Sequence, residues 1–110
     1  MTRRVVVTGI GVVSAIGLDR ESFWASLREG RCGIRPMQSV PPGELRFSNA
    51  AEIPEFDSSR YFDLKEAGFL DPFAQYGVVA GREAVADSGL EWKQGLGENA
   101  AIVTGSALGG

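Results

Sequence analysis

The hydrophobic and polar positions from residue 71 to residue 90 predict one amphipathic helix with both ends marked. Asp71 is a good N-cap, because its carboxylate can accept from the free backbone N–H groups of the first turn. Pro72 suits the first helical position, where no N–H is needed. Gly89 ends the helix, because glycine takes the left-handed conformation at little cost.

At about 100° per residue, the polar side chains of this helix form only a thin arc. Its members are Asp71, Gln75, Arg82, Glu83 and Asp87. We therefore expect the helix to be covered on more than one side. Gly77 and Gly81 each cost about 1 kcal/mol relative to alanine, which is usually tolerated where another backbone comes close. With Ala84 and Ser88 they predict a close-approach stripe on a packed helix.

Three short segments have the pattern of β-strands. Residues 4–8 (RVVVT) form a β-branched run, typical of a strand buried on both faces of a sheet. Residues 45–53 (LRFSNAAEI) alternate between apolar and polar, which indicates a strand with one wet face near a sheet edge. Residues 100–104 (AAIVT) form the third run. The prolines of residues 35–43 predict a loop before the second strand.

Helices fall between these segments. Asp19 predicts the N-cap of a helix that ends before Gly30, and Asp57 can cap one short helical turn. Residues 92–99 read as a glycine-containing connection. The order is therefore β-α-β-α-β, which implies an α/β layer structure with right-handed crossovers. Because the last residues, 105–110 (GSALGG), resemble the start of a further element, we expect the chain to be interrupted within a fold.

Composition narrows the class of protein. A chain of 110 residues can form one small domain with a modest core. Its formal charge of −3, without Lys/Arg clusters, argues against a nucleic-acid partner. The first apolar run is too short for a signal peptide, and no segment is long enough to span a membrane. With a single cysteine, which fits a reducing compartment, we expect a soluble cytoplasmic protein.

Two features resemble a nucleotide-binding motif and a catalytic nucleophile, but their sequence context argues against both roles. The run GIGVVSAIG, from Gly9 to Gly17, resembles a dinucleotide fingerprint, but the next helix starts near Asp19 instead of at the glycines. Cys32 would need a base or a cationic neighbour to form a thiolate. The chain has no histidine, although Arg31 could lower the thiol pKa somewhat. We interpret Cys32 as an inert loop thiol.

Three stretches together resemble the β-ketoacyl-acyl-carrier-protein synthases of the thiolase fold, especially the type II elongating enzymes. They are RRVVVTGIGVVSAIG at the start, DPFAQYGVVAGREAVADSGL in the middle and GSALGG at the end. The resemblance spans residues 1–110 and identifies them as the N-terminal part of a synthase domain. The predicted β-α-β-α-β order then corresponds to part of the N-terminal half of a thiolase-like layered fold.

The resemblance implies an acyltransferase that loads an acyl chain on a cysteine, decarboxylates malonyl-carrier protein and joins the two. Family members use a cysteine at a helix N-terminus and two histidines, because a thiolate attacks a thioester while donors hold enolate charge. None of these residues matches a position here, so we assign no catalytic residue and expect the 110-residue chain alone to be inactive. We expect no cofactor or metal. The implied partners are an acyl carrier protein and a second synthase chain, in a homodimer or heterodimer.

Two positions carry over from the family. Leu108 matches the apolar position of GSGIGG motifs that lies at the acyl pocket and limits chain length, although it could instead be a core leucine at a helix start. Lys65 matches one of the basic residues that meet an acidic carrier protein. Gly68 and Phe69 stand where further basic residues are expected, which weakens charge complementarity. Alternatively, Phe69 packs under the long helix toward Phe73.

Two other interpretations stay open beside the synthase fragment. The first is a synthase-like, non-catalytic chain-length subunit that acts by dimerising with an active subunit. The second is a complete binding module, which would require a monodisperse and cooperatively folding chain. The residue at the nucleophile position of the longer protein distinguishes the first from an active synthase.

Overall fold

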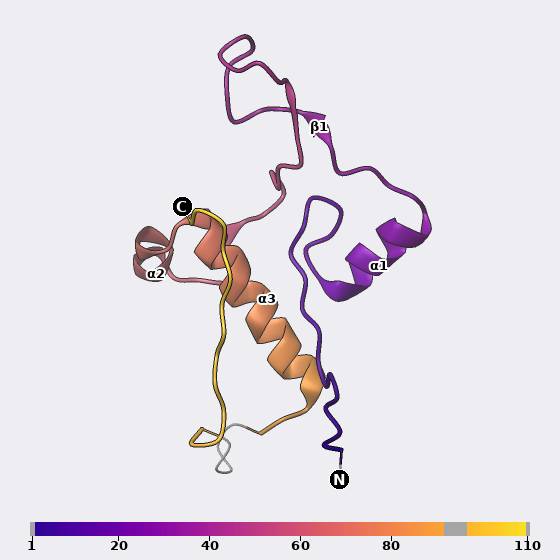
Figure 1. Ribbon diagram of the computed structural model, residues 1–110. Helices are drawn as coiled ribbons and strands as arrows, with labels where there is room; N and C mark the ends of the chain where they lie inside the picture. The colour runs from indigo at the N-terminus through magenta and orange to yellow at the C-terminus, as the bar shows by residue number, and fades with distance from the viewer. Residues whose placement is uncertain (1, 92–96, 110) are drawn as a thin grey trace.

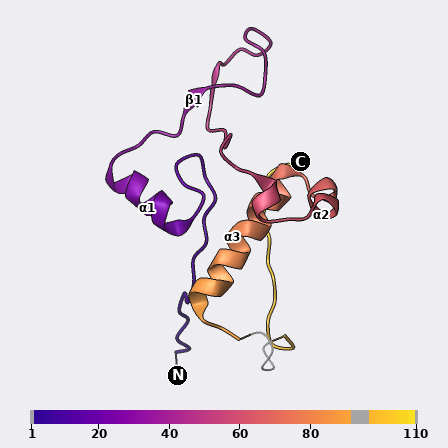
Figure 2. The ribbon, with the colours of Figure 1, turned by 180° about the vertical axis from the view of Figure 1, so that it is seen from behind.

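The computed structural model describes residues 2–91 and 97–109 (Figures 1 and 2). Its elements, in chain order, are α1 (Arg20–Arg28), β1 (Arg35–Pro36), β2 (Asn49–Ala50), the 3-10 turn η1 (Ser58–Arg60), α2 (Leu64–Phe69) and α3 (Pro72–Ser88). The N-terminal and C-terminal segments both run alongside α3 in the two views. The radius of gyration is 17.1 Å, whereas a compact domain of this length would have about 13 Å. The arrangement is therefore elongated around α3.

The long helix α3 confirms the prediction made for residues 71–90. It begins with Pro72 in its first turn and ends at Gly89, whose φ of 65° is left-handed. One detail of the prediction is wrong, because the Asp71 side chain makes no capping hydrogen bond. The backbone carbonyl of Asp71 instead accepts from the N–H of Gln75, at 3.0 Å.

The helix α1 also begins and ends where the sequence predicts. The Asp19 carboxylate accepts from the Ser22 N–H at 2.7 Å, and the Ser22 hydroxyl in turn accepts from the Asp19 N–H at 3.3 Å. This reciprocal pair is a capping box. Asp57 caps η1 by accepting from the Ser59 N–H at 3.0 Å. Helix starts are therefore well predicted by their local polar residues.

Glycines of the N-terminal segment pack directly against α3. A Cβ atom at Gly9 would lie 2.1 Å from the Ala84 carbonyl oxygen, and one at Gly11 would lie 1.8 Å from that of Ala80. Two residues of extended chain rise about 6.6 Å, close to the 5.4 Å pitch of a helix. Alternate residues of the segment can therefore meet successive turns of α3.

The close-approach stripe is thus confirmed in part. Its members Ala84 and Ser88 do face the glycines of the N-terminal segment. A Cβ atom added at Gly77 or Gly81, however, would meet no described atom within 4 Å, so no described backbone approaches these two glycines. Close packing requires glycine on the extended N-terminal segment instead of on α3, because α3 presents its backbone carbonyl groups to that segment.

Residues 10–20 are tied to α3 by two carboxylates. Glu83 accepts from the backbone N–H of Val12 and from that of Arg20, both at 2.8 Å. Asp87, one turn later, accepts from the Ile10 N–H at 3.0 Å and pairs with the Arg20 guanidinium. Acidic side chains on the polar arc of α3 therefore hold residues 10–20 against the helix.

The other side of α3 packs on aromatic residues. Val79 and Phe62 are the buried apolar side chains of the described residues. Phe56 stacks on Tyr61, with ring centroids 5.3 Å apart, and meets the edge of Tyr76 at 4.8 Å. The expectation that α3 is covered on more than one side is confirmed, and the core is small.

The predicted β-α-β-α-β order is not observed in residues 2–91 and 97–109. Residues 4–8 and 100–104 are extended but unpaired within that part of the chain, and Val5 and Val103 are 92% and 94% exposed. An apolar β-branched run indicates a strand only when neighbouring strands supply hydrogen bonds and cover both faces. No neighbouring strand is present among the described residues.

The predicted strand over residues 45–53 is also too long. Only Asn49–Ala50 is a strand, paired antiparallel with Arg35–Pro36 in the segment expected to be a loop. The pairing is short because Pro36 lacks an N–H. One more backbone bond follows, from the Met37 N–H to the Ser48 carbonyl at 2.8 Å. The Glu52 carboxylate then accepts from the N–H groups of Gln38 and Ser39, at 2.7 and 3.0 Å, in place of the opposite strand. Within the predicted connection 92–99, residues 92–96 lie outside the described residues.

Candidate functional site

The short helix α2 carries Lys65 and was not predicted from the sequence. It is fixed at its start by a capping box, in which Asp63 accepts from the Glu66 N–H at 2.7 Å and Glu66 accepts from the Asp63 N–H at 3.3 Å. The D-x-x-E spacing of DLKE was the signal that could have predicted it.

A buried amide holds the other end of α2 on α3. The Gln75 side chain, expected on the polar arc, is buried and donates to the Leu70 carbonyl at 2.8 Å and to the Ala67 carbonyl at 3.3 Å. Both carbonyls belong to the end of α2, where backbone acceptors lack helical partners. Gln75 therefore positions α2 relative to α3.

The outward side of α2 is exposed. Phe69 is 81% exposed and Leu64 is 93% exposed, and Lys65 is exposed between them. The alternative that Phe69 packs under the long helix is therefore wrong for the described residues. Gly68 also faces open space. Leu64 was not singled out from the sequence, because the helix that carries it was not predicted.

Leu108 lies in the C-terminal extended segment. Its side chain is 98% exposed, so it is not a core residue of the described chain. The next residue, Gly109, has a φ of 74° and donates its N–H to the Ser106 hydroxyl at 3.0 Å. A Cβ atom at Gly109 would lie 3.7 Å from the Phe73 ring. This contact brings the segment that carries Leu108 to the first turn of α3.

The segments that carry the two predicted site residues therefore lie near the same end of α3. Both views show α2 and the C-terminus beside the N-terminal end of α3 (Figures 1 and 2). Lys65 is on α2, and Leu108 is in the segment that runs back along α3. The long helix thus sets the relative position of the candidate docking element and the candidate pocket segment.

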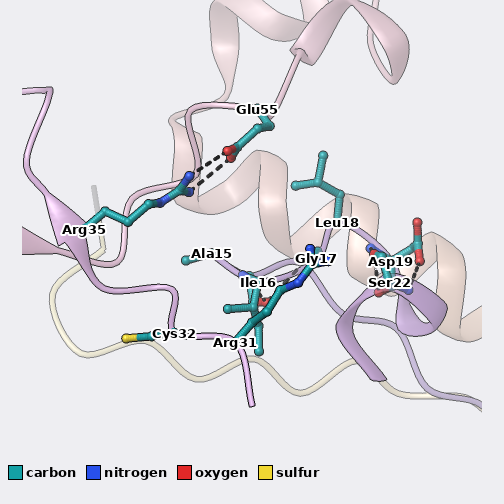
Figure 3. A pocket seen from close by; sticks show the side chains of 11 residues that line it. Ala15, Ile16, Gly17, Leu18, Asp19, Ser22, Arg31, Cys32, Arg35 and Glu55 are labelled. Carbon is teal, nitrogen blue, oxygen red and sulfur yellow. Dashed lines mark hydrogen bonds and ion pairs between the residues drawn. The ribbon is translucent and has the colours of Figure 1, made fainter. Parts of the chain in front are cut away.

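A separate hollow of about 490 Å³ lies between residues 14–22 and the loop around Cys32 (Figure 3). The Cys32 thiol is exposed, and its sulfur is 3.8 Å from the Ile34 carbonyl oxygen. Arg31, the cationic neighbour considered from the sequence, is paired with Glu29 at 2.8 Å. Because the chain has no histidine, this hollow offers no base for Cys32.

The charged side chains of that hollow already have partners. The Arg35 guanidinium donates to both oxygens of Glu55, at 2.8 and 3.3 Å (Figure 3). This pairing raises the pKa of Arg35 and lowers the pKa of Glu55 from their usual values. The Ser22 N–H likewise lowers the pKa of Asp19. These charges stabilise loops and a helix start, and none is left to activate a substrate.

Two further kinds of site are absent from the part of the chain that the structure describes. Residues 2–91 and 97–109 contain no group of three His, Cys, Asp or Glu side chains arranged to hold a metal ion. No helix among them is both long enough and apolar enough to cross a membrane.

Comparison with known proteins gives a consistent family. The family described as "Beta-ketoacyl synthase, N-terminal domain" matches residues 2–110. The chain is 38% identical over 108 residues to 3-oxoacyl-(acyl-carrier-protein) synthase 2 of Vibrio harveyi, and 35% identical to the enzyme of the same name from Coxiella burnetii. Each match covers 98% of this chain and 26% of the relative. The chain therefore spans about a quarter of the length of these relatives.

A solved structure, "The ishigamide ketosynthase/chain length factor", is similar in fold. Its TM-score is 0.69 at 38% sequence identity, and the match covers 83% of this chain and 23% of that one. The chain therefore resembles a ketosynthase in backbone structure as well as in sequence. The match shows a ketosynthase-like fold for the 83% of the chain that it covers.

Proposed function

Because the chain belongs to the β-ketoacyl synthase family, as a match to its N-terminal domain over residues 2–110, we propose that the full-length protein is a 3-oxoacyl-(acyl-carrier-protein) synthase. The observation that carries this proposal is the 38% identity to the Vibrio harveyi enzyme along nearly the whole chain. The proposed reaction is the decarboxylative condensation of an acyl thioester with malonyl-carrier protein, in fatty acid or polyketide-type biosynthesis.

The reaction has two stages. A cysteine thiolate attacks the acyl thioester, the acyl group moves to that cysteine, and the carrier leaves as a thiol. Malonyl-carrier protein then loses CO₂, and the resulting enolate attacks the acyl-cysteine to form the new C–C bond and release the thiolate. Cys32 is exposed and has no adjacent base, so we assign the nucleophile to a residue outside this chain.

In this proposal residues 1–110 supply two accessory elements. α2 contributes the carrier-docking surface that includes Lys65, and residues 105–109 contribute Leu108 to the acyl pocket. The exposure of both side chains supports these roles, because each is free to meet a carrier protein or another part of the full-length protein. The proposed site of action is the cytoplasm, with a synthase dimer as the working unit.

The proposed reaction is tested by incubating the full-length protein with acyl- and malonyl-carrier protein and measuring the β-ketoacyl product by mass spectrometry. We expect a product that is one two-carbon unit longer and the release of one CO₂ per condensation. Cys32→Ala is expected to keep kcat/KM within a few-fold, because the thiol contributes little to packing. A loss of about 10³ in kcat/KM would instead identify Cys32 as the nucleophile.

A second candidate function is favoured by the ketosynthase/chain length factor structure. The full-length protein would then be a non-catalytic chain-length subunit that pairs with an active synthase. It would show no condensation alone and would change the product length of its partner. The same assay, with and without an active partner subunit, separates the two functions.

The role of Leu108 is tested by Leu108→Phe in the full-length protein. We expect kcat/KM for long acyl substrates to fall about tenfold while that for the shortest remains within twofold, because the ring fills pocket volume without touching the thioester. Ala107→Ser, one residue earlier, is a matched control expected to leave chain-length preference unchanged. Equal loss for short and long substrates would contradict a pocket role for Leu108.

A further inference from the structure

The turn that carries Leu108 is closed by a side chain. The Ser106 hydroxyl accepts from the Gly109 N–H at 3.0 Å, three residues on, as an N-cap serine does at a helix start. The segment is nevertheless not helical, because the φ of Gly109 is 74°, in the left-handed region. Leu108 therefore lies inside a small hydrogen-bonded ring.

The closed turn restricts the backbone at Leu108. The left-handed φ of Gly109 costs a residue with a Cβ atom free energy, so the turn depends on glycine at this position. On the other side of Leu108, the hydroxyl of Ser106 fixes the distance between the two ends of the turn. The direction of the Leu108 Cα–Cβ bond is therefore set by the turn.

The ring of Phe73 lies beside this turn. A Cβ atom at Gly109 would be 3.7 Å from the Phe73 Cζ atom, an ordinary van der Waals contact. Phe73 belongs to the first turn of α3, where the Gln75 N–H donates to the Asp71 carbonyl at 3.0 Å. Phe73 therefore links the position of the turn to the start of a regular helix.

We propose that Ser106 and Phe73 are positioning residues for acyl chain-length selection, which act by holding Leu108 at one depth in the acyl pocket. The proposal rests on the pocket role of Leu108 proposed above and adds what controls it. An acyl chain too long for the pocket has to displace Leu108. Because the closed turn resists this displacement, long chains are disfavoured, and a loosened turn should accept them.

Ser106→Ala in the full-length protein tests the hydroxyl. We expect the ratio of kcat/KM for long to short acyl thioesters to rise about fivefold, mainly through a lower KM for the long substrate. Ser106→Thr keeps the hydroxyl and should restore the original ratio. Ser39→Ala, which removes a hydroxyl bonded to Glu52 in a loop, is the matched control and should leave the ratio unchanged. For a chain-length subunit, the readout is the length of the products made with its active partner.

Phe73→Ala tests the ring and should raise the same ratio about fivefold, because Gly109 loses its contact with α3. Phe73→Met should retain most of the original preference, since methionine is a flexible apolar side chain that can fill the same space. Trp24→Ala, at an exposed aromatic residue of α1, is the control. Melting curves verify that each variant is folded.

A double-mutant cycle separates positioning from a general loss of structure. If Ser106 acts through Leu108, Ser106→Ala should not change the chain-length ratio further when Leu108 is already alanine. Amide hydrogen exchange of residues 105–109, followed by mass spectrometry, gives a second readout that needs no activity. Ser106→Ala should speed the exchange of the Gly109 N–H about tenfold.

The outcomes distinguish this inference from the function on which it rests. If Leu108→Phe leaves chain-length preference unchanged, the pocket role itself is wrong. If Leu108→Phe acts as expected while Ser106→Ala and Phe73→Ala leave the ratio unchanged, the positioning inference alone is overturned. Additive effects of Ser106→Ala and Leu108→Ala, or unchanged exchange at Gly109, would also overturn it.

Discussion

Gly11→Ala is expected to detach the N-terminal segment from α3 and to lower the free energy of unfolding by about 3 kcal/mol or more. The added Cβ would lie 1.8 Å from the Ala80 carbonyl oxygen, and this atom belongs to a helix backbone that cannot move aside locally. Separation of the two backbones would also stretch the hydrogen bonds from Ile10 and Val12 to α3. In thermal unfolding of the full-length protein, Tm should fall by about 6 °C or more.

Gly81→Ala is the matched control for this experiment. It lies on α3, where a Cβ meets no described atom within 4 Å, so the change should stabilise the helix by about 1 kcal/mol. Opposite signs for the two glycines would show that the close approach is at residues 9–11. A Gly11→Ala chain that unfolds within 1 °C of the unchanged chain would contradict the packing described here.

Glu83→Ala is expected to cost about 2 to 4 kcal/mol of unfolding free energy. Its half-buried carboxylate accepts from the Val12 and Arg20 N–H groups, which lie 71 and 63 residues away in the sequence. Removal leaves both donors without this acceptor and frees both ends of the loop between them. Glu83→Gln should be intermediate, because the amide keeps one acceptor oxygen and turns a donor toward the other N–H.

The control for Glu83 is Glu29→Ala. Glu29 pairs with Arg31 at the surface, where both side chains are more than half exposed, so its loss should cost under about 1 kcal/mol. Chemical unfolding of the three variants, followed by circular dichroism, gives the comparison. Equal losses for Glu83→Ala and Glu29→Ala would mean that the Glu83 carboxylate does not anchor the N-terminal segment.

Local signals in the sequence predict the helices of this chain well. The Asp19 cap, the Pro72 start and the Gly89 end all depend on residues within one turn of the helix, and all are confirmed. The missed helix α2 had the same kind of signal in DLKE. The capping hydrogen bond expected from the Asp71 side chain does not form, because the N-cap position of the backbone does not require the carboxylate to turn toward the helix.

Features that depend on distant partners were predicted less well. The runs at residues 4–8 and 100–104 have strand composition, but a strand needs a neighbour, and sequence pattern does not supply one. Gln75 looked like a surface residue until its carbonyl partners on α2 were known. Similarly, the anchoring role of Glu83 depends on donors in a segment remote in sequence, and only its spacing to Asp87 hinted at a shared face.

The candidate site residues were predicted from motif positions, and the structure adds how exposed their side chains are. Lys65 and Leu108 came from matching motifs, and the structure locates their segments at the same end of α3. The question left by the sequence was whether Phe69 is buried or free. Its exposure decides that question for the described residues.

The central proposal is that residues 1–110 are a non-catalytic N-terminal part of an active condensing enzyme. It is tested most directly by treating the full-length protein with an acyl-carrier thioester and mapping the acylated residue by peptide mass spectrometry. We predict one acyl group per chain, on a cysteine outside residues 1–110, with Cys32 unmodified. Acylation of Cys32, or no acylation of a folded protein, would contradict this claim.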